Sequence, residues 1–468
     1  MRRLSILVLL IAWPAGAAES VDSPVGLALP DDPVLVGLVK EAIANRPELK
    51  QVKARIAAER ERIPQSKVLP DPALSLGIQN DGFRGIQIGK METSYVSIMA
   101  SQTFPWSGKR TLRGDLAGIG ARDAELDLRR AQLSVTAEVA RAYVDLLLVR
   151  DQLRLLGKLE SLWAQSESLA RFRYEAGESP QSDLLRAQLQ RSRLRQKRFA
   201  LESDERRQLL VLNRLRGHSF EEAIPSERSL ADLPDPPVID LEKALVADEK
   251  ESPELQKALL VEEQADRSVA LANKDRFPDV TVSAGVMPRG GGFETMWQAG
   301  VSVNLPIWGS QKQHRAIAEF RSRGEAARDG AEVVRRLLRQ RVNERREALG
   351  AILATNHLYR EGLLVQSEAT VASTLAQYQV GRVSFASVLE ALAGHLDDQD
   401  GYLQSIAAAQ KIAIAEQEIS LESPGGPAAG GMGKSPMPGA GSTAGGASAA
   451  KSSVGSAQGD DTASMTRM

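Results

Sequence analysis

The sequence contains no cysteine among its 468 residues, and aromatic residues make up only 4% of it. Without cysteine the chain has no disulfide bonds, no thiolate metal sites and no lipid anchor on an N-terminal cysteine. A large compact core usually contains more aromatic side chains, so the composition favours long helices rich in alanine, leucine and charged residues. The formal net charge is only −1, which gives no indication of nucleic-acid binding.

Long hydrophobic runs are also missing after the N-terminus. Met1–Arg3 is basic, Leu4–Trp13 is apolar, and Ala15–Ala17 has the small residues of a cleavage site. We therefore expect a signal peptide at residues 1–17, with a buried N-terminal helix as the alternative. No later segment has 18 apolar residues without a charge, so no transmembrane helix is predicted. An exported chain of this kind is periplasmic, secreted or inserted in the outer membrane.

Residues 280–287 and 297–305 alternate between apolar and small or polar side chains, which predicts two strands that each have one apolar face. The loop between them, 288–294, is rich in glycine. Each strand approaches the ~9–11 residues that a tilted strand needs to cross a bilayer. Alternation of this kind is typical of transmembrane barrels.

A second pair of alternating segments lies earlier, at 74–79 and 96–101. Each pair ends in a joint with a proline, a tryptophan and a glycine, at Phe104–Gly108 and Leu305–Gly309, before a long helical stretch. Two hairpins of a soluble α+β protein are the alternative. The repetition, the matched lengths and the export signal favour membrane strands.

From Gly108 to about Tyr174 the sequence has almost no helix breaker, so about 65 residues would span roughly 100 Å as one helix. Apolar residues recur within it at the spacings of three and four that are typical of a coiled coil: Val139, Ala142, Leu146, Val149, Leu153 and Leu156. After the break at Gly177–Pro180, a second helix runs back to about Arg216. Further helices are expected at 31–67, with Pro47 near a first-turn position, and from Ser252 to before Phe277.

Landmarks recur in the two halves of the chain at offsets of about 201 to 208 positions: Pro47 and Pro253, Pro70 and Pro278, Pro105 and Pro306, Tyr174 and Tyr378. We therefore expect two structural repeats, at about 34–216 and 252–422, within a mature domain of residues 18–422. Residues 217–251 are predicted to be an irregular segment on the outside of the helices. Residues 423–468 are rich in Gly, Ala, Ser and Pro, and are expected to be a disordered tail.

Four membrane strands per chain cannot close a barrel, and an open sheet edge in lipid leaves backbone groups without partners. The strands must therefore come from several copies. Two copies give eight strands and three give twelve, and physics alone does not choose between them. The faces expected to point inward are small and polar, which suits an open pore: Ser75, Gly77, Ser97, Ser101, Thr281, Ser283, Gly285, Gly300 and Ser302.

The chain resembles the TolC family of outer-membrane efflux ducts over about Val34 to Glu422. The resemblance rests on the duplicated Pro-Glu-Leu, the Pro-Asp before each hairpin, the joints at Pro105 and Pro306, and the Tyr-x-x-Gly motifs at Tyr174–Gly177 and Tyr378–Gly381. It implies an α+β membrane protein, a homotrimer whose four strands per chain form a shared 12-stranded barrel in outer-membrane lipid. A long α-helical coiled-coil tunnel would continue the barrel into the periplasm. The implied function is passive conduction in a tripartite pump, with a periplasmic membrane-fusion adaptor and an inner-membrane RND-type pump as partners.

Two segments, Leu69–Ser75 and Gln102–Arg110, resemble the branch of the family that serves heavy-metal efflux pumps, which implies cations as substrates. Many members of that branch carry a lipid on an N-terminal cysteine, which this sequence lacks. An outer-membrane duct for type I protein secretion, with an ABC-type pump, is an alternative. A secreted coiled-coil scaffold is another, although it gives no reason for two matched hairpins.

The two Tyr-x-x-Gly breaks should be the tips of helical hairpins, where Gly177 and Gly381 supply the backbone freedom for a tight reversal. By resemblance to the family, these tips would form the periplasmic aperture and the adaptor-docking surface. Acidic side chains near them would favour cations. The candidate residues of the aperture and docking surface are Asp183, Ser387, Glu390 and Arg382. Of these, Ser387 stands where family members often carry aspartate.

No nucleophile motif, phosphate loop or catalytic carboxylate pair is present, so no enzyme is predicted. The four histidines are scattered and form no zinc-helix spacing: His218, His314, His357 and His395. We therefore expect no cofactor, no metal site and no nucleic-acid partner.

Overall fold

The structure is a computed structural model that describes residues 32–226 and 228–421. These residues all belong to the first of the chain's two units, Met1–Pro424. The predicted signal peptide at 1–17 and the predicted disordered tail at 423–468 lie outside the described residues. Within the described ranges, no helix is both long and apolar enough to cross a membrane.

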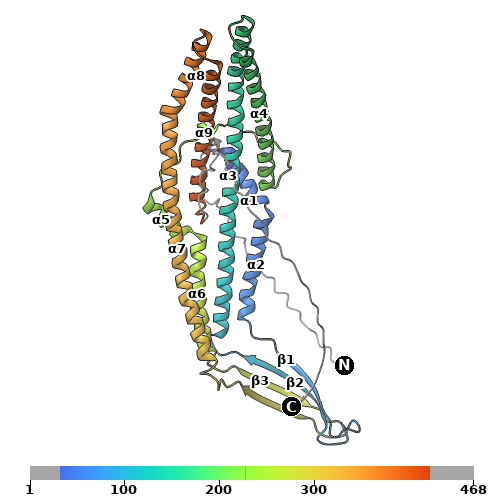
Figure 1. Ribbon diagram of the computed structural model, residues 1–468. Helices are drawn as coiled ribbons and strands as arrows, with labels where there is room; N and C mark the ends of the chain where they lie inside the picture. The colour runs from blue at the N-terminus through green and yellow to red at the C-terminus, as the bar shows by residue number, and fades with distance from the viewer. Residues whose placement is uncertain (1–31, 227, 422–468) are drawn as a thin grey trace, which may run out of the picture. The chain divides into compact units, whose positions relative to one another are not determined.

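The two predicted hairpins join into one antiparallel sheet (Figure 1). Its strands follow the order of the chain: β1 Ala73–Gln79, β2 Tyr95–Phe104, β3 Val280–Met287 and β4 Met296–Val303. The sequence predicted all four strands, with ends within three residues of those observed. Because β2 pairs with β3, the two repeats are joined by backbone hydrogen bonds, while β1 and β4 are the two edges of the sheet.

The register keeps like side chains together across the sheet. Ser101 lies opposite Ser283, which lies opposite Gly300, whereas the neighbouring row contains Ala100 and Ala284. The hydroxyl oxygens of Thr103 and Thr281, which also lie opposite each other, are 2.9 Å apart. One face of the sheet is therefore small and polar and the other is apolar, as the alternation predicted. Much of the apolar face is exposed: Leu74, Leu76, Ile78, Trp297 and Val301.

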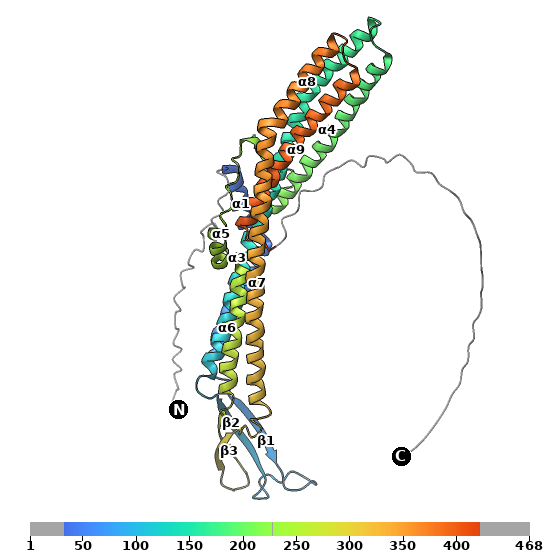
Figure 2. The same ribbon diagram turned by 60° about the vertical axis from the view of Figure 1, so that its left-hand side comes forward.

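Two long helical hairpins extend from the sheet (Figure 2). In the first repeat, α3 runs without interruption for 67 residues, Lys109–Glu175, and α4 returns at Gln181–Arg216. In the second, α7 covers Gln313–Leu358, a π-helical turn covers Tyr359–Leu363, α8 covers Leu364–Gln379, and α9 returns at Phe385–Gln417. Each outgoing helix therefore has its joint with the sheet at one end and its hairpin tip at the other.

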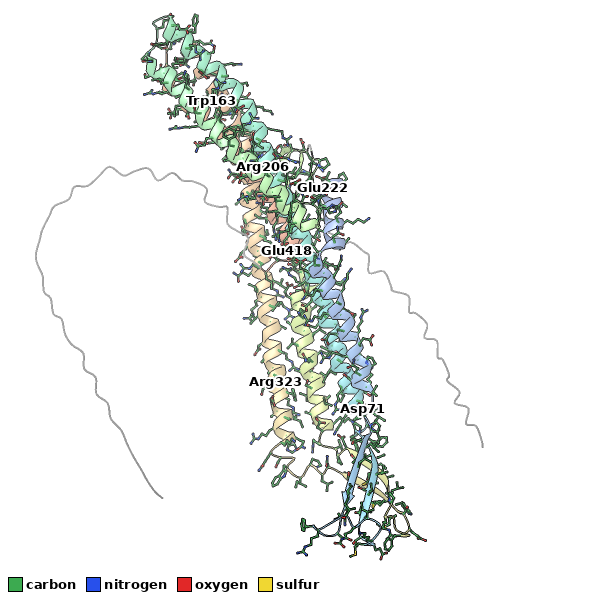
Figure 3. The ribbon with its side chains drawn as sticks, turned by 90° about the vertical axis from the view of Figure 1, so that its right-hand side faces the viewer. Asp71, Trp163, Arg206, Glu222, Arg323 and Glu418 are labelled. Carbon is green, nitrogen blue, oxygen red and sulfur yellow. The ribbon has the colours of Figure 1, made fainter. Side chains whose placement is uncertain are left out.

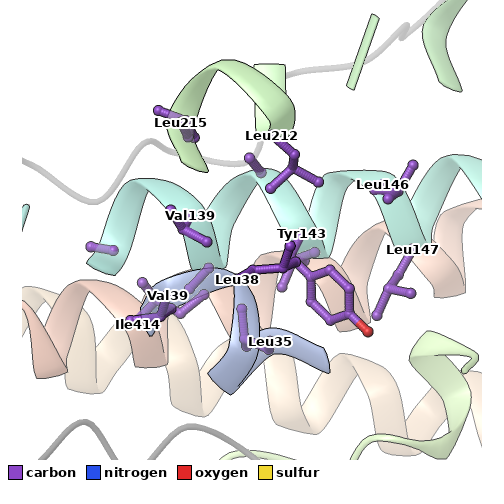
Figure 4. Close-up of a cluster of buried hydrophobic side chains, with 14 of the residues drawn as sticks. Leu35, Leu38, Val39, Val139, Tyr143, Leu146, Leu147, Leu212, Leu215 and Ile414 are labelled. Atoms are coloured by element: carbon purple, nitrogen blue, oxygen red, sulfur yellow. The ribbon is translucent and has the colours of Figure 1, made fainter. Parts of the chain in front are cut away.

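The predicted coiled-coil positions of α3 form the core. Leu146 is completely buried, Leu156 is 1% exposed, and Val139 is packed with residues of α1 and α9 (Figure 4). Each fully buried leucine of this kind contributes about 1.5–3 kcal/mol to the free energy of unfolding. One buried cluster lies around the middle of α3 and a second lies towards the tips, so the hairpins are packed along most of their length.

Two expectations were wrong. The helix predicted at 31–67 is two helices, α1 Pro33–Asn45 and α2 Pro47–Lys67. Arg46 between them has the extended backbone angles φ −60° and ψ 125°. The proline ring of Pro47 disfavours helical angles in the residue before it, and proline is well placed to begin a new helix.

The segment 217–251 is not merely an irregular cover on the outside. It contains a short 3₁₀ turn, Leu230–Asp232, and the helix α5, Leu241–Glu251, which is followed by α6 at Pro253–Lys274. Ile224 is 2% exposed and Leu230 is completely buried, and both belong to the main core cluster. Isolated apolar side chains of this segment are thus part of the core, because they fill the space beside α1 and α3.

Candidate functional site

The first hairpin tip is a glycine-ended reversal. Gly177 has φ +75°, a left-handed conformation that side chains with a Cβ atom rarely adopt. Its N–H donates to the carbonyl of Tyr174 at 3.0 Å, and the N–H of Glu178 donates to the carbonyl of Arg173 at 2.8 Å. These two bonds satisfy the last carbonyl groups of α3 and direct the chain through Pro180 into α4.

The second tip repeats this geometry. Gly381 has φ +73°, its N–H donates to the carbonyl of Tyr378 at 3.0 Å, and the N–H of Arg382 donates to the carbonyl of Gln377 at 2.9 Å. Here the next helix, α9, has a side-chain cap, because the hydroxyl of Ser384 accepts the N–H of Ser387 at 3.4 Å. The left-handed glycines predicted from the sequence are thus present at both reversals.

The two tips are fastened to each other by Arg173. Its guanidinium lies 5.0 Å from the centre of the Tyr378 ring and donates a hydrogen bond to the Tyr378 carbonyl. Tyr378 is 2% exposed and its ring centre lies 5.3 Å from that of Phe385, at the start of α9. A cation over an aromatic face together with a charge-assisted hydrogen bond makes this a polar link between the hairpin ends.

The residues predicted for the aperture lie at the tips or within the first turns that follow them. Asp183 occupies the first turn of α4, half-buried on the side of Tyr378, and Ser387 occupies the matching turn of α9. Burial, followed by the negative charge of Asp183, raises the pKa of the Tyr378 hydroxyl. Glu390 and Arg382 are exposed. The structure therefore places Asp183 beside the fastening and leaves Glu390 and Arg382 available at the surface.

Sequence reasoning did not single out Arg173. It immediately precedes the Tyr-x-x-Gly motif at Tyr174, but the matching position in the second repeat is Gln377, so no duplicated pattern marks it. The two tyrosines of the motif also differ, since Tyr378 is buried while Tyr174 is 40% exposed. Only the packing of one tip against the other reveals the difference.

The first joint between sheet and helices, at Pro105, is anchored to the second repeat. The ammonium group of Lys109, the first residue of α3, is buried and lies 2.9 Å from both a carboxylate oxygen of Asp279 and the carbonyl of Phe277. The same oxygen of Asp279 accepts the backbone N–H of Trp106 at 2.8 Å. The Trp106 and Phe277 rings stack with their centres 5.1 Å apart. The end of β2 is thereby fixed to the beginning of β3.

The second joint, at Pro306, has none of these contacts within the described residues. Trp308 is 66% exposed and Ile307 is 75% exposed. Asp71, which precedes β1 as Asp279 precedes β3, lies exposed where α2 ends and the sheet begins (Figure 3). The two joints thus differ in their contacts within the described residues.

A buried cluster of charges lies where α5, α7 and the end of α9 meet. Arg345 has no exposed surface, and its guanidinium contacts the carboxylates of Glu416 and Asp248, the latter at 3.5 Å. Burial, together with the charge of Glu416, raises the pKa of Asp248 to about 7, against the opposing effect of Arg345. Glu418, labelled in Figure 3, is buried nearby and binds Arg130 and Arg141.

A metal centre is not part of these arrangements. Across residues 32–226 and 228–421, no three histidine, aspartate or glutamate side chains are grouped so as to hold a metal ion.

Comparison with known proteins gives a consistent result. The sequence pattern of the outer membrane efflux protein family matches residues 38–218 and 247–420. None of the curated proteins compared with the chain matches it.

Three solved structures illustrate the similarity of the fold. A membrane protein from Pseudomonas aeruginosa aligns with a TM-score of 0.71 and 17% identity over 90% of this chain and 99% of that one. The outer membrane protein VceC from Vibrio cholerae aligns with a TM-score of 0.66 and 17% identity, covering 82% and 95% of the two chains. The open MtrE outer membrane channel of Neisseria gonorrhoeae aligns with a TM-score of 0.68 and 16% identity, covering 83% and 89%.

Proposed function

Because the chain belongs to the outer membrane efflux protein family, we propose that it is the passive outer-membrane channel of a tripartite efflux pump. The observation that carries the proposal is that the family match extends over both repeats, and so includes both strand pairs and both hairpin tips. Members of this family are transport channels, so the chain acts in the outer membrane as a channel and not as an enzyme.

We propose a homotrimer that closes a shared barrel. The sheet has an exposed apolar face for outer-membrane lipid, a small polar face for a passage, and two edge strands, β1 and β4. Backbone groups at a sheet edge need partners in lipid, so the edges of one copy must pair with those of others. Three copies supply twelve strands, which leave a passage, whereas eight strands leave an interior largely filled by side chains.

The helical part would extend into the periplasm and present its tips to the other components. The tips are the ends farthest from the sheet along α3 and α8, and they carry the exposed Arg382 and Glu390. We propose that they form the aperture and the docking surface for a periplasmic membrane-fusion adaptor, behind which an inner-membrane RND-type pump supplies the energy. Division of the mature chain into two repeats joined by 217–251 is part of the same proposal.

Heavy-metal cations are the proposed substrates. The support is the resemblance of Leu69–Ser75 and Gln102–Arg110 to the metal-efflux branch of the family. In the structure these two segments lie together, because the side-chain amide of Gln102 donates to the carbonyl of Pro70 at 2.7 Å. The first segment leads into β1, and the second continues from β2 through the first joint.

The test uses a bacterial strain that lacks its own efflux channels and carries a candidate adaptor and pump. Expression of the chain should restore export of divalent copper, zinc or cobalt, measured as lower metal content of the cells. Restored export of organic dyes without any effect on metals would contradict the proposed metal substrates but would not contradict the proposed efflux channel. Secretion of a large protein instead would favour the type I alternative.

Assembly is measured separately. The chain should fractionate with the outer membrane, and a lysine-reactive crosslinker should give a ladder that stops at three chains. A soluble monomer would contradict the channel, and a ladder that stops at two would contradict the twelve-stranded barrel. Gly381→Pro should abolish efflux but leave the trimer intact, because proline fixes φ near −65° and removes the N–H that closes the tip.

A further inference from the structure

The contact between the two repeats at the base of the helices has two parts. The strands β2 and β3 pair in a fixed register, in which Ala100 lies opposite Ala284. Beside them, the first joint packs on the segment before β3 through the ion pair of Lys109 with Asp279 and the stacking of Trp106 on Phe277. Strand pairing and joint contact thus form a single unit, because the joint directly follows β2 and the segment 277–279, here called the acidic segment after Asp279, directly precedes β3.

The sequence contains the components of this unit a second time, and there they form neither the ion pair nor the ring stacking of the first joint within the described residues. The second joint carries Trp308, which is exposed, and Lys312, which forms no ion pair. The segment before β1 carries Leu69 and the exposed Asp71, at the positions that correspond to Phe277 and Asp279. The edge strands β4 and β1 complete the set. A joint that follows β4 and an acidic segment that precedes β1 are available at opposite edges of one sheet.

We propose that these components meet between two copies of the chain, so that the contact between subunits has the same form as the contact between the two repeats of one chain. The inference rests on the proposed trimer and adds its register. Pro105 and Pro306 are 201 positions apart, and Pro70 and Pro278 are 208 positions apart. Applied to Ala100 and Ala284, these offsets place Val301 of β4 directly opposite Leu76 of the partner subunit.

The chemistry of the resulting pairs agrees with this register. Along the apolar face, Val303 would lie opposite Leu74 of the partner subunit. Along the polar face, three small or polar pairs follow: Ser302 with Ser75 of the partner subunit, Gly300 with Gly77 of the partner subunit, and Gln298 with Gln79 of the partner subunit. A shift by one residue would place every apolar side chain opposite the polar face of the neighbour. A shift by two would keep the faces but separate the joint from its acidic segment by about 7 Å.

At the joint, the exposed Trp308 would cover Leu69 of the partner subunit, as Trp106 covers Phe277. Lys312, which immediately precedes α7, would pair with Asp71 of the partner subunit, as Lys109 at the start of α3 pairs with Asp279. The second joint has a longer connection to its helix, so a different residue supplies the positive charge. Two oppositely charged side chains that form no ion pair among residues 32–226 and 228–421 thereby acquire each other as partners.

The absence of cysteine makes the register directly measurable by disulfide formation. The test variant is Val301→Cys with Leu76→Cys, and the shifted controls combine Val301→Cys with Leu74→Cys or with Ile78→Cys. Residues directly opposite in an antiparallel pair have Cβ atoms about 4.5–5.5 Å apart, close to disulfide geometry. Ala100→Cys with Ala284→Cys is the matched positive control, because it is the equivalent pair within one chain and should form a disulfide without increasing the mass.

In outer membranes, we expect the test variant to give covalent dimers and trimers roughly tenfold faster than either shifted control, whose Cβ atoms lie too far apart. Faster linkage of a shifted pair would overturn the proposed register but would not contradict the proposed trimer. No linkage in any pair, although the lysine-reactive crosslinker still yields trimers, would overturn the pairing of β4 with β1. Failure of that crosslinker to yield trimers would instead contradict the proposed assembly itself, and with it this inference.

The joint contact is tested by charge reversal. Lys312→Glu and Asp71→Lys should each lower the temperature at which the trimer dissociates in detergent, and the double variant should recover most of the loss. Lys250→Glu, at an exposed lysine on α5, controls for the change of charge. A double variant no more stable than the single ones would show that Lys312 and Asp71 do not face each other.

Discussion

The guanidinium of Arg173 in the first helical hairpin lies 5.0 Å from the ring centre of Tyr378 in the second and donates to its carbonyl. The residues are 205 positions apart, yet they join the two tips at the far end of the helices. The guanidinium is also adjacent to Gly381, since a Cβ atom added there would lie 3.0 Å from it. The link and the reversal of the second hairpin are therefore one structural unit.

Arg173→Ala should loosen the tips. A hydrogen bond to a charged group contributes about 1.5–3 kcal/mol, which corresponds to roughly a ten- to hundredfold change in the equilibrium between closed and separated tips. We expect faster hydrogen exchange at residues 375–390 and a higher conductance in planar bilayers. Arg171→Ala, which removes the exposed Arg171 from its pair with Glu167 on the same helix and leaves Glu167 paired with Arg191, is the control and should change neither. Equal exchange in the two variants would contradict the role of Arg173.

The two tip glycines should differ in their tolerance of alanine. Both have positive φ, so each substitution costs about 1–2 kcal/mol of local stability. At Gly177 the added Cβ would meet no atom within 4 Å, whereas at Gly381 it would press on Arg173. Gly381→Ala should therefore open the tips more than Gly177→Ala, measured as leak conductance. Identical leak in the two variants would mean that Arg173 moves aside freely.

Asp183→Ala combined with Glu390→Ala should reduce the preference of the channel for cations, because carboxylates repeated around an aperture attract positive ions. The reversal potential in a salt gradient measures this preference. Asp204→Ala with Glu361→Ala removes the same charge away from the tips and should leave the preference unchanged. If the first double variant also shows the wild-type reversal potential, Asp183 and Glu390 do not line the aperture.

Asp248→Asn should change how stability depends on pH. Its pKa in the folded protein is about 7, raised mainly by burial from an ordinary value of 3.8. The folded state therefore binds more protons than the unfolded state between these values, so its contribution to stability falls as the pH rises from about 4 to about 7. At about 1.4 kcal/mol per pKa unit, the full effect is of the order of 4 kcal/mol.

Thermal unfolding of the detergent-solubilised protein at pH 5 and pH 8 measures this dependence. Asp248→Asn should be more stable than wild type at pH 8. Its unfolding temperatures at pH 5 and pH 8 should differ much less than those of the wild type. Arg345→Ala is the contrasting variant, because it leaves buried carboxylates without a counter-charge and should destabilise by about 3–5 kcal/mol. An unchanged pH dependence in Asp248→Asn would show that another group is responsible.

Local patterns in the sequence predicted much of this structure. The alternation at 280–287 gave the bounds of β3, and the left-handed backbone of Gly177 and Gly381 follows from a motif that only a reversal explains. The two errors have local causes as well. Pro47 was compatible with one helix or with the start of a second, and the apolar residues of 217–251 have no periodicity that marks them as buried.

The interactions that sequence analysis missed are those between distant segments. Arg173 pairs with a backbone carbonyl of the other repeat, and Arg345 contacts acidic residues on α5 and α9. Neither contact leaves a trace in residue spacing along the chain, because it depends on how the long helices are aligned with one another. In both cases the contact follows from the packing of helices that are distant in the sequence.

The even number of strands in the sheet bears on what sets the number of copies in the proposed assembly. Each chain has four strands of alternating direction, so in the proposed barrel β4 would meet the next β1 in antiparallel fashion, whatever the number of chains in the ring. Hydrogen bonding at the seam is therefore satisfied equally well by rings of different sizes. In the proposed assembly, the number of subunits would then be set by how the long helices of neighbouring copies pack against one another. Substitutions along the helices, rather than in the strands, are then the changes that would alter the stoichiometry of the channel.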